Sequence, residues 1–275
     1  MTFYTRLQVI CDLEFSEILM AEIAEVGFDT FLETEHGFEA YAESFDESLL
    51  NETKEKYSHV SPLIFQQDQV ERRNWNEEWE KNVEPIFVED KCLVRAEFHK
   101  IEKKFPYEII ITPKMSFGTG HHQTTYLMLK AQMQIDHRNK RVIDAGCGTA
   151  ILSIMASKLG GKDVEAFDID EWSVINGKEN AEKNNCTNIH IQRGKISDLT
   201  WNGKFDLILA NINKNILLAE MKEYSQYLQT GGELLLSGFY TKDIVDLERE
   251  AQHYGLQREA EDERESWATL LLKKI

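Results

Sequence analysis

The stretch Arg141-Val-Ile-Asp-Ala-Gly-Cys-Gly-Thr149 decides the fold of this chain. Its apolar half predicts a buried strand, and its second half predicts a tight turn with a carboxylate, Asp144, where the two meet. Gly146 and Gly148 let the backbone turn sharply and approach a ligand closely. A second apolar run, residues 164–168, also ends in an acid, Asp168. This pattern predicts an α/β nucleotide-type pocket; the plainer alternative is a structural corner with no ligand.

Two residues argue against a dinucleotide site. Ile151 stands where the dinucleotide pattern has its third glycine, which serves close packing under a pyrophosphate. Asp144 at the mouth of the loop would repel a pyrophosphate, which prefers bare N–H groups at a helix start. A carboxylate suits a cationic ligand. S-adenosylmethionine carries a sulfonium and an ammonium but no phosphate, and Asp168 fits its ribose hydroxyls, so we expect this cofactor rather than NAD.

From residue 141 onward the sequence alternates between strand and helix patterns. We expect strands at 141–144, 164–168, 189–193, 205–210 and 233–237, helices at 150–159, 171–184, 215–228 and 242–254, and a final antiparallel pair at 256–260 and 267–272. Repeated strand–helix units predict an α/β fold with a doubly wound, mainly parallel sheet and an antiparallel last strand. A ligand of such a sheet binds at the carboxyl ends of the strands.

Asn211 directly follows the expected strand 205–210. At that strand end, beside the glycine loop, its amide oxygen would accept an incoming N–H. The alternative is that Asn211 caps the next helix, a role for which Asn213 is better placed. We expect Asn211 to face the pocket.

Upstream, two expected strands at 92–98 and 107–111 lead into a glycine-punctuated loop that ends at Thr125 and continues as a helix over 126–134. A helix start rich in N–H groups and hydroxyls is able to receive a carboxylate or a ring edge. His121 and His122 lie in this loop. Adjacent histidines do not share a helix face, and no spaced His or Cys partner is nearby, so we expect no metal site.

The first 68 residues predict a small α+β domain with the order β-α-β-β-α-β, which is ferredoxin-like. Its first helix is expected over 16–26, with Ser16 as the cap, and its last strand over 60–65. A charged helix over 71–83 carries Trp75 and Trp79 one turn apart. It either docks onto a domain or serves as a linker helix. We expect the linker at 69–84 and the cofactor-binding α/β domain at 85–275.

Charge is distributed unevenly along the 275 residues. Residues 1–60 hold 14 acidic and three basic side chains, a net charge of −11, which leaves −6 of the total −17 for the other 215 residues. This acidic domain is either a solvated surface that aids solubility or a surface that attracts a basic protein. The field repels phosphate backbones, so we expect no direct nucleic acid binding.

Composition excludes several classes of protein. A hydrophobic content of 42% with only 4 prolines is typical of a globular chain. We find no apolar run of the roughly 18 residues that a membrane span needs, and no secretory signal pattern. The four scattered cysteines suggest neither disulfides nor zinc. We therefore expect a cytoplasmic protein without membrane association.

Four segments together resemble the ribosomal protein L11 methyltransferases (PrmA). They are V-I-D-A-G-C-G-T at 142–149, F-D-I-D at 167–170, D-L-I-L-A-N-I at 206–212 and F-G-T-G-H-H-Q-T-T at 117–125. The first three occur in class I methyltransferases generally, whereas the fourth is much more specific. The resemblance covers nearly the whole chain, because the acidic N-terminal domain and the Trp-bearing helix also match.

The resemblance implies a protein methyltransferase. Its cofactor would be S-adenosylmethionine, and its substrate the amines of a basic ribosomal protein, as lysine side chains, an N-terminal α-amine or both. We expect Gly146, Gly148, Asp168 and Asn211 to bind the cofactor, and the resemblance adds Thr125 to this set. We expect Asn211 also to align the amine. We expect a monomer. A non-catalytic cofactor-binding module and a small-molecule or RNA methyltransferase remain alternatives.

Two segments depart from related patterns. Many class I enzymes carry an acid near the adenine after the third strand, whereas this chain has Gly194-Lys-Ile-Ser-Asp198, with the acid displaced. The ending Asn211-Ile-Asn-Lys214 also differs from the Asn-Pro-Pro-aromatic pattern of glutamine and DNA amino methyltransferases. The sequence therefore disfavours those substrates and leaves adenine recognition open.

Overall fold

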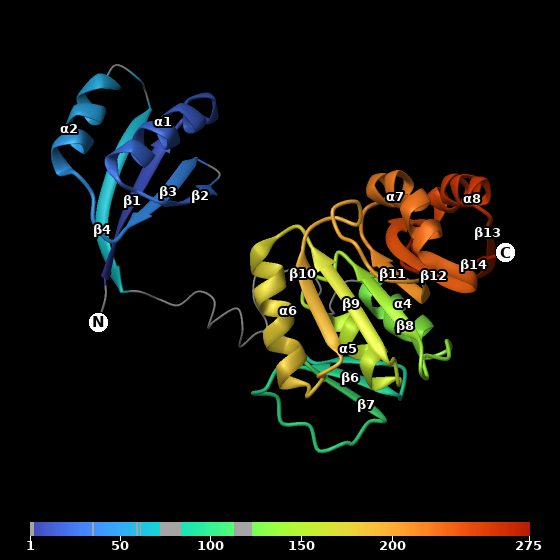
Figure 1. The fold of residues 1–275 in the computed structure, drawn as a ribbon. Helices are drawn as coiled ribbons and strands as arrows, with labels where there is room; N and C mark the ends of the chain where they lie inside the picture. The colour runs from blue at the N-terminus through green and yellow to red at the C-terminus, as the bar shows by residue number, and fades with distance from the viewer. Residues whose placement is uncertain (1–2, 35, 59, 61, 72–83, 113–122) are drawn as a thin grey trace. The chain divides into compact units, whose positions relative to one another are not determined.

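The computed structural model describes residues 3–34, 36–58, 60, 62–71, 84–112 and 123–275. The chain divides into two compact units, Met1–Trp79 and Glu80–Ile275 (Figure 1). The expected linker helix with Trp75 and Trp79, and the loop with His121 and His122, lie outside the described residues.

The smaller unit is a four-stranded antiparallel sheet in the order β2-β3-β1-β4, with two helices in the chain order β-α-β-β-α-β. Its elements are β1 (Phe3–Cys11), α1 (Leu13–Val26), β2 (Thr30–Thr34), β3 (Gly37–Ala42), α2 (Glu47–Lys56) and β4 (Leu63–Glu71). Alternate residues of β1 and β3 face the helices, as expected for a sheet that is covered on one side. Leu7, Val9 and Phe38 are fully buried in this core with Leu19 and Ile23 of α1.

The larger unit is built around a seven-stranded sheet in the order β10-β9-β8-β11-β12-β14-β13. Its strands are β8 (Arg141–Ala145), β9 (Asp163–Asp168), β10 (Ile189–Arg193), β11 (Phe205–Asn211), β12 (Leu228–Tyr240), β13 (Leu256–Arg264) and β14 (Trp267–Lys274). The first five run parallel, and β14 is antiparallel to both β12 and β13. This confirms the predicted α/β class and the antiparallel last strand.

Helices cover both faces of this sheet (Figure 1). The helices are α4 (Gln123–Gln132), α5 (Ile151–Lys158), α6 (Glu171–Lys183), α7 (Lys214–Tyr227) and α8 (Ile244–His253), with a short 3-10 turn at Thr241–Asp243 before α8. Successive side chains of a strand point to opposite faces. In β8, Val142 packs in the core that contains α4 and α5, whereas Ile143 packs in the core that contains α7 and α8. Burial on both faces explains the unbroken apolar runs of these strands.

A second, three-stranded sheet precedes the large one in the chain. It consists of β5 (Ile86–Val88), β6 (Cys92–Arg95) and β7 (Tyr107–Ile110), with β6 and β7 parallel. The sequence predicted β6 and β7 but missed β5, whose three residues are too few for a periodic signal. Val88, Val94 and Ile109 join the core formed by α4 and α5.

Several predicted boundaries were wrong, for local reasons. Helix α1 begins at Leu13 after Asp12, not at Ser16, which lies buried inside the helix. Strand β4 runs to Glu71, where the sequence placed the start of a helix. Strand β12 begins at Leu228, five residues before the predicted start at residue 233, and its pairing with β11 shifts register between Phe205↔Leu228 and Leu207↔Glu233. No helix in the described part of the chain is long and apolar enough to cross a membrane.

Candidate active site

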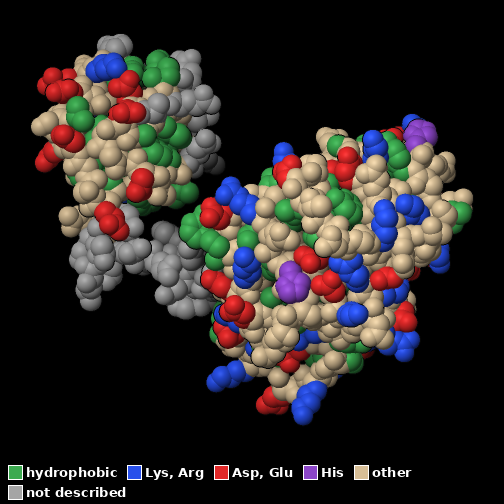
Figure 2. Space-filling model, viewed as in Figure 1, with side chains coloured by type: hydrophobic (Ala, Val, Ile, Leu, Met, Phe, Trp, Pro, Cys, Tyr) green, Lys and Arg blue, Asp and Glu red, His purple; other side chains and the backbone are tan. Residues whose placement is uncertain are grey.

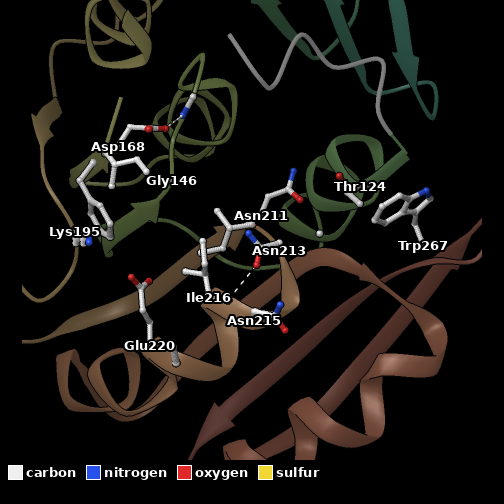
Figure 3. Close-up of a pocket in the computed structure, with 16 residues that line it drawn as sticks. Thr124, Gly146, Asp168, Lys195, Asn211, Asn213, Asn215, Ile216, Glu220 and Trp267 are labelled. Carbon is white, nitrogen blue, oxygen red and sulfur yellow. Dashed lines mark hydrogen bonds between the residues drawn. The ribbon is translucent and has the colours of Figure 1, made fainter. Parts of the chain in front are cut away.

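A cavity of about 750 Å³ opens at the carboxyl ends of β8, β9 and β11 (Figure 3). Gly146, Gly148, Asp168 and Asn211 all line it, so four of the five predicted cofactor residues are brought together. Parallel pairing explains the convergence: β8 pairs with both β9 and β11, and the three strands end at one edge. This is the edge at which ligands of doubly wound sheets bind.

The glycine loop is fastened to the end of β9. The backbone N–H groups of Gly146 and Cys147 donate to the Phe167 carbonyl at 2.9 and 3.0 Å. Gly146 has a φ of +68°, and a Cβ added there would lie 2.5 Å from Cγ2 of Ile212. A side chain at this position would therefore be strained and would intrude on the pocket wall.

Asp168 ends β9 and is held by backbone N–H groups on both carboxylate oxygens. Oδ2 accepts from Gly148 N at 2.9 Å, and Oδ1 accepts from Asp170 N at 3.0 Å. A carboxylate oxygen has two lone-pair sites, so each oxygen keeps acceptor capacity for a ligand hydroxyl. The side chain is thus fixed in direction while it lines the cavity.

Asp144 does not line the pocket, contrary to the expectation that it faces a cationic ligand. It is fully buried beneath the loop, and its Oδ2 accepts from the backbone N–H of Ser153 at 3.0 Å and from the Ser153 hydroxyl at 2.5 Å. Ser153 lies in the first turn of α5, so Asp144 caps that helix from the preceding strand. Burial raises the pKa of Asp144 to about 7, against the opposing effect of the Ser153 hydrogen bonds.

Asn211 and Asn213 divide the two roles that the sequence left open. Asn213 is the N-cap of α7, and its side chain accepts from Ile216 N at 3.2 Å. Asn211 is 8% exposed, and its Oδ1 is buried with no hydrogen-bond partner among the described residues. A buried amide oxygen without a partner is costly, so it marks a position where an N–H of a ligand would be bound.

Thr125 lies on α4 and is fully buried, but it is not part of the cavity lining; the lining residue is its neighbour Thr124. The Oγ1 of Thr125 has no partner within the described ranges. The helix that carries both begins at Gln123, three residues before the predicted start, so the two hydroxyls lie in its first turn.

Lys195, Glu220 and Trp267 also line the cavity and were missed by the sequence analysis (Figure 3). Lys195 follows β10 and was a detectable candidate, since loops after parallel strands surround such sites. Glu220 is in the second turn of α7, and Trp267 begins β14. Only the tertiary arrangement of α7 and β14 brings these two to the pocket.

No group of His, Cys, Asp or Glu side chains in the described part of the chain is arranged to hold a metal ion. All four cysteines are free, with Cys11, Cys92 and Cys147 buried. The polar groups of the cavity are instead suited to an organic ligand with hydroxyls and amines.

The residues present fit S-adenosylmethionine. Gly146 leaves room for close approach, and Asp168 offers oriented acceptors to a ribose. Asn211 offers an amide oxygen that has no partner within the part of the chain that the structure describes. With the strand order given above, the fold and this pocket define a class I methyltransferase, a class that uses S-adenosylmethionine as methyl donor.

Comparison with known proteins narrows the class. The family described as ribosomal protein L11 methyltransferase (PrmA) matches residues 16–275. Proteins named ribosomal protein L11 methyltransferase are 39% identical in Phocaeicola vulgatus, over 94% of both chains, and 45% identical in Porphyromonas gingivalis, over 92% of this chain and 89% of the relative. The crystal structure of ribosomal protein L11 methylase from Lactobacillus delbrueckii subsp. bulgaricus is 28% identical with a TM-score of 0.65, and it covers 70% of this chain and 100% of that one. The chain belongs to the ribosomal protein L11 methyltransferase (PrmA) family.

Proposed function

We propose that this enzyme transfers methyl groups from S-adenosylmethionine to amines of ribosomal protein L11, as lysine side chains, the N-terminal α-amine or both. The names of the relatives support the substrate. The observation that carries the chemistry is that Asn211 lines the cavity and that its buried Oδ1 has no hydrogen-bond partner among the described residues. Bound S-adenosylmethionine would supply an electrophilic methyl on its sulfonium.

We assign the cofactor to Gly146, Gly148, Asp168 and Asn211, which line the cavity, and to Thr125 behind it. The two glycines give close backbone approach, and Asp168 accepts from the ribose hydroxyls. Thr125 contributes through its hydroxyl in the first turn of α4, which has no partner within the described ranges.

An amine must be neutral to attack the methyl. A free lysine has a pKa of about 10.4 and an α-amine about 7.7–8.0, and transfer from water into a cleft favours the neutral form of either. The Asn211 oxygen would accept one amine N–H and so direct the nitrogen lone pair. No histidine lines the described part of the cavity. Alignment and proximity therefore carry most of the rate in this proposal.

Replacing Asn211 with Ala tests this role. We expect single-turnover methylation of ribosomal protein L11 to slow by at least about tenfold, since a lost hydrogen bond to an aligned group corresponds to roughly 1.4 kcal/mol or more. Asn202→Ala is the matched control, because Asn202 is exposed and outside the cavity. Unchanged single-turnover rates in Asn211→Ala would refute the alignment role.

We further propose that the acidic smaller unit, residues 1–68 with the end of β4, recruits the basic substrate, that a linker follows β4 up to residue 84, and that 85–275 perform the transfer. Acidic side chains spread over the smaller unit with few basic ones support this (Figure 2). Glu47, Glu52 and Glu55 are exposed on α2. Basic partners bound by such a surface lose affinity as salt screens the charges.

The recruitment test neutralises α2 in the full chain. We expect Glu52→Gln with Glu55→Gln to raise the KM for ribosomal protein L11 and to weaken its salt dependence, while kcat stays unchanged. The control neutralises Glu102 and Glu182, two exposed acids of the larger unit. Equal KM values for both double variants would contradict recruitment by α2.

We also propose that the enzyme acts as a cytoplasmic monomer without binding nucleic acid or membrane.

A further inference from the structure

Two charged side chains line the cavity without a role in the proposal above. Lys195 stands in the loop after β10, and Glu220 stands on α7. Figure 3 shows both at the end of the cavity away from Thr124 and Trp267. This end therefore lies on the far side of Asn211 from Trp267.

Glu220 is held in a fixed position. The Tyr224 hydroxyl donates to its Oε2 at 2.5 Å, and Tyr224 itself is fully buried. This bond leaves Oε1 available to a ligand. Burial raises the pKa of Glu220, and the Lys195 ammonium acts against that rise. The two side chains are thus close enough to interact electrostatically.

Lys195 directly follows a residue that is hydrogen-bonded to Asp168, the residue assigned to the ribose. Strand β10 pairs with β9 so that Arg193 lies opposite Asp168, and the Gly194 N–H donates to the Asp168 carbonyl at 3.0 Å. A base attached to a ribose at Asp168 would extend along this loop. Ile169, Ile216 and Ala219 line the same cavity and offer apolar surface to the faces of a planar base.

We propose that Glu220 and Lys195 recognise the Watson–Crick edge of the cofactor's adenine, with Glu220 accepting from the 6-amino group and Lys195 donating to N1. This inference rests on the proposed binding of S-adenosylmethionine in this cavity. Adenine presents a donor beside an acceptor on that edge, and a carboxylate beside an ammonium is the complementary pair. Many class I enzymes carry an acid after the strand that corresponds to β10, whereas this chain has Lys195 there. In this proposal Glu220 of α7 supplies the acid instead.

The inference predicts discrimination against hypoxanthine. In that base a carbonyl replaces the 6-amino group, and N1 carries a hydrogen. The carbonyl oxygen, an acceptor, would then face the Glu220 carboxylate, and the N1–H donor would face the Lys195 ammonium. Both contacts are then repulsive or unpaired, and sites built to bind a polar group reject an analogue that lacks it.

Calorimetric titration of the full chain with S-adenosylhomocysteine and S-inosylhomocysteine tests this. We expect the wild type to bind the adenine compound at least about tenfold more tightly. Glu220→Gln should reduce this ratio by about tenfold, because the amide is able to donate to the hypoxanthine carbonyl. Lys195→Met should reduce it too, since the clash with the N1 hydrogen is removed. Glu182→Gln, an exposed acid on α6 outside the cavity lining, should keep the wild-type ratio.

The outcomes separate this inference from the assignment of the cofactor site. Equal binding of the two compounds by the wild type, or a wild-type ratio in both Glu220→Gln and Lys195→Met, would overturn the adenine contacts alone. Undiminished binding of S-adenosylhomocysteine by Asp168→Ala would instead overturn the placement of the cofactor, on which the inference depends.

Discussion

Asp144 should make the larger unit less stable as pH rises. Most carboxylates act in the opposite direction, because their pKa is lowered in the folded state. The side chain is fully buried, and burial raises its pKa to about 7 from an ordinary value of 3.8. Between these two values the folded state binds more protons than the unfolded state. Stability therefore falls as pH rises through this window, and the loss is complete above about pH 7.

Replacing Asp144 with Asn isolates this effect. An Asn oxygen still accepts from the Ser153 N–H and hydroxyl, but the side chain does not titrate. One pH unit corresponds to about 1.4 kcal/mol, so the wild type should lose up to about 3 kcal/mol relative to Asp144→Asn between pH 5 and pH 8. A constant offset is expected as well, since the new amide N–H₂ takes the place of Oδ1, which has no described partner. Only the change with pH is diagnostic.

Urea unfolding of the full chain at pH 5 and pH 8, followed by tryptophan fluorescence, measures this change. Trp201 reports on the larger unit, in whose core it lies. Asp170→Asn is the matched control. Asp170 also caps a helix through a serine, with Oδ2 at 2.9 Å from both Ser173 N and Ser173 Oγ, but hydrogen bonds lower its pKa. Its pH dependence therefore lies below pH 5. A difference between wild type and Asp144→Asn that is equal at both pH values would refute the reasoning.

Two further predictions follow from the loop and from the cap of α7. Gly146→Ala places a Cβ 2.5 Å from Cγ2 of Ile212 at a φ of +68°. Binding of S-adenosylhomocysteine in a calorimetric titration should therefore weaken by at least about tenfold. Wild-type affinity would contradict the requirement for glycine in this loop. Asn213→Ala removes the acceptor of Ile216 N and should lower the free energy of unfolding by about 1 kcal/mol in urea, while an unchanged value would contradict the cap.

The order of strands and helices in the larger unit was predictable because each buried strand is a continuous apolar run. Glycine, Asp or Asn residues mark the ends of several of these runs. Gly146, Gly148, Asp168 and Asn211 were predictable as pocket residues for the same reason, since each stands at a strand end that the parallel pairing brings to one edge. Position along the chain is sufficient for such residues once the sheet is known to be parallel.

Residues on helices and on the antiparallel strands could not be predicted in this way. Glu220 reaches the cavity only because of the rotation of α7 about its axis, which is set by the packing of Leu217, Met221 and Tyr224 in the core. Trp267 reaches it because β14 pairs in register with β12, so that Trp267 lies opposite Tyr240. Neither the rotation nor the register is determined by local sequence alone.

The preference for a cofactor without phosphate has a different physical cause from the one that the sequence suggested. Asp144 does not face the ligand, so its charge is not what repels a pyrophosphate. Instead, two of the N–H groups that a pyrophosphate would use around this helix start are already engaged: Ser153 N–H by Asp144 and Gly148 N–H by Asp168. The missing third glycine at Ile151 acts in the same direction, because Ile151 is buried in the core with α4. The two carboxylates thus disfavour a dinucleotide by occupying two backbone N–H donors of the protein, and Asp168 keeps lone pairs for the ribose that both kinds of cofactor share.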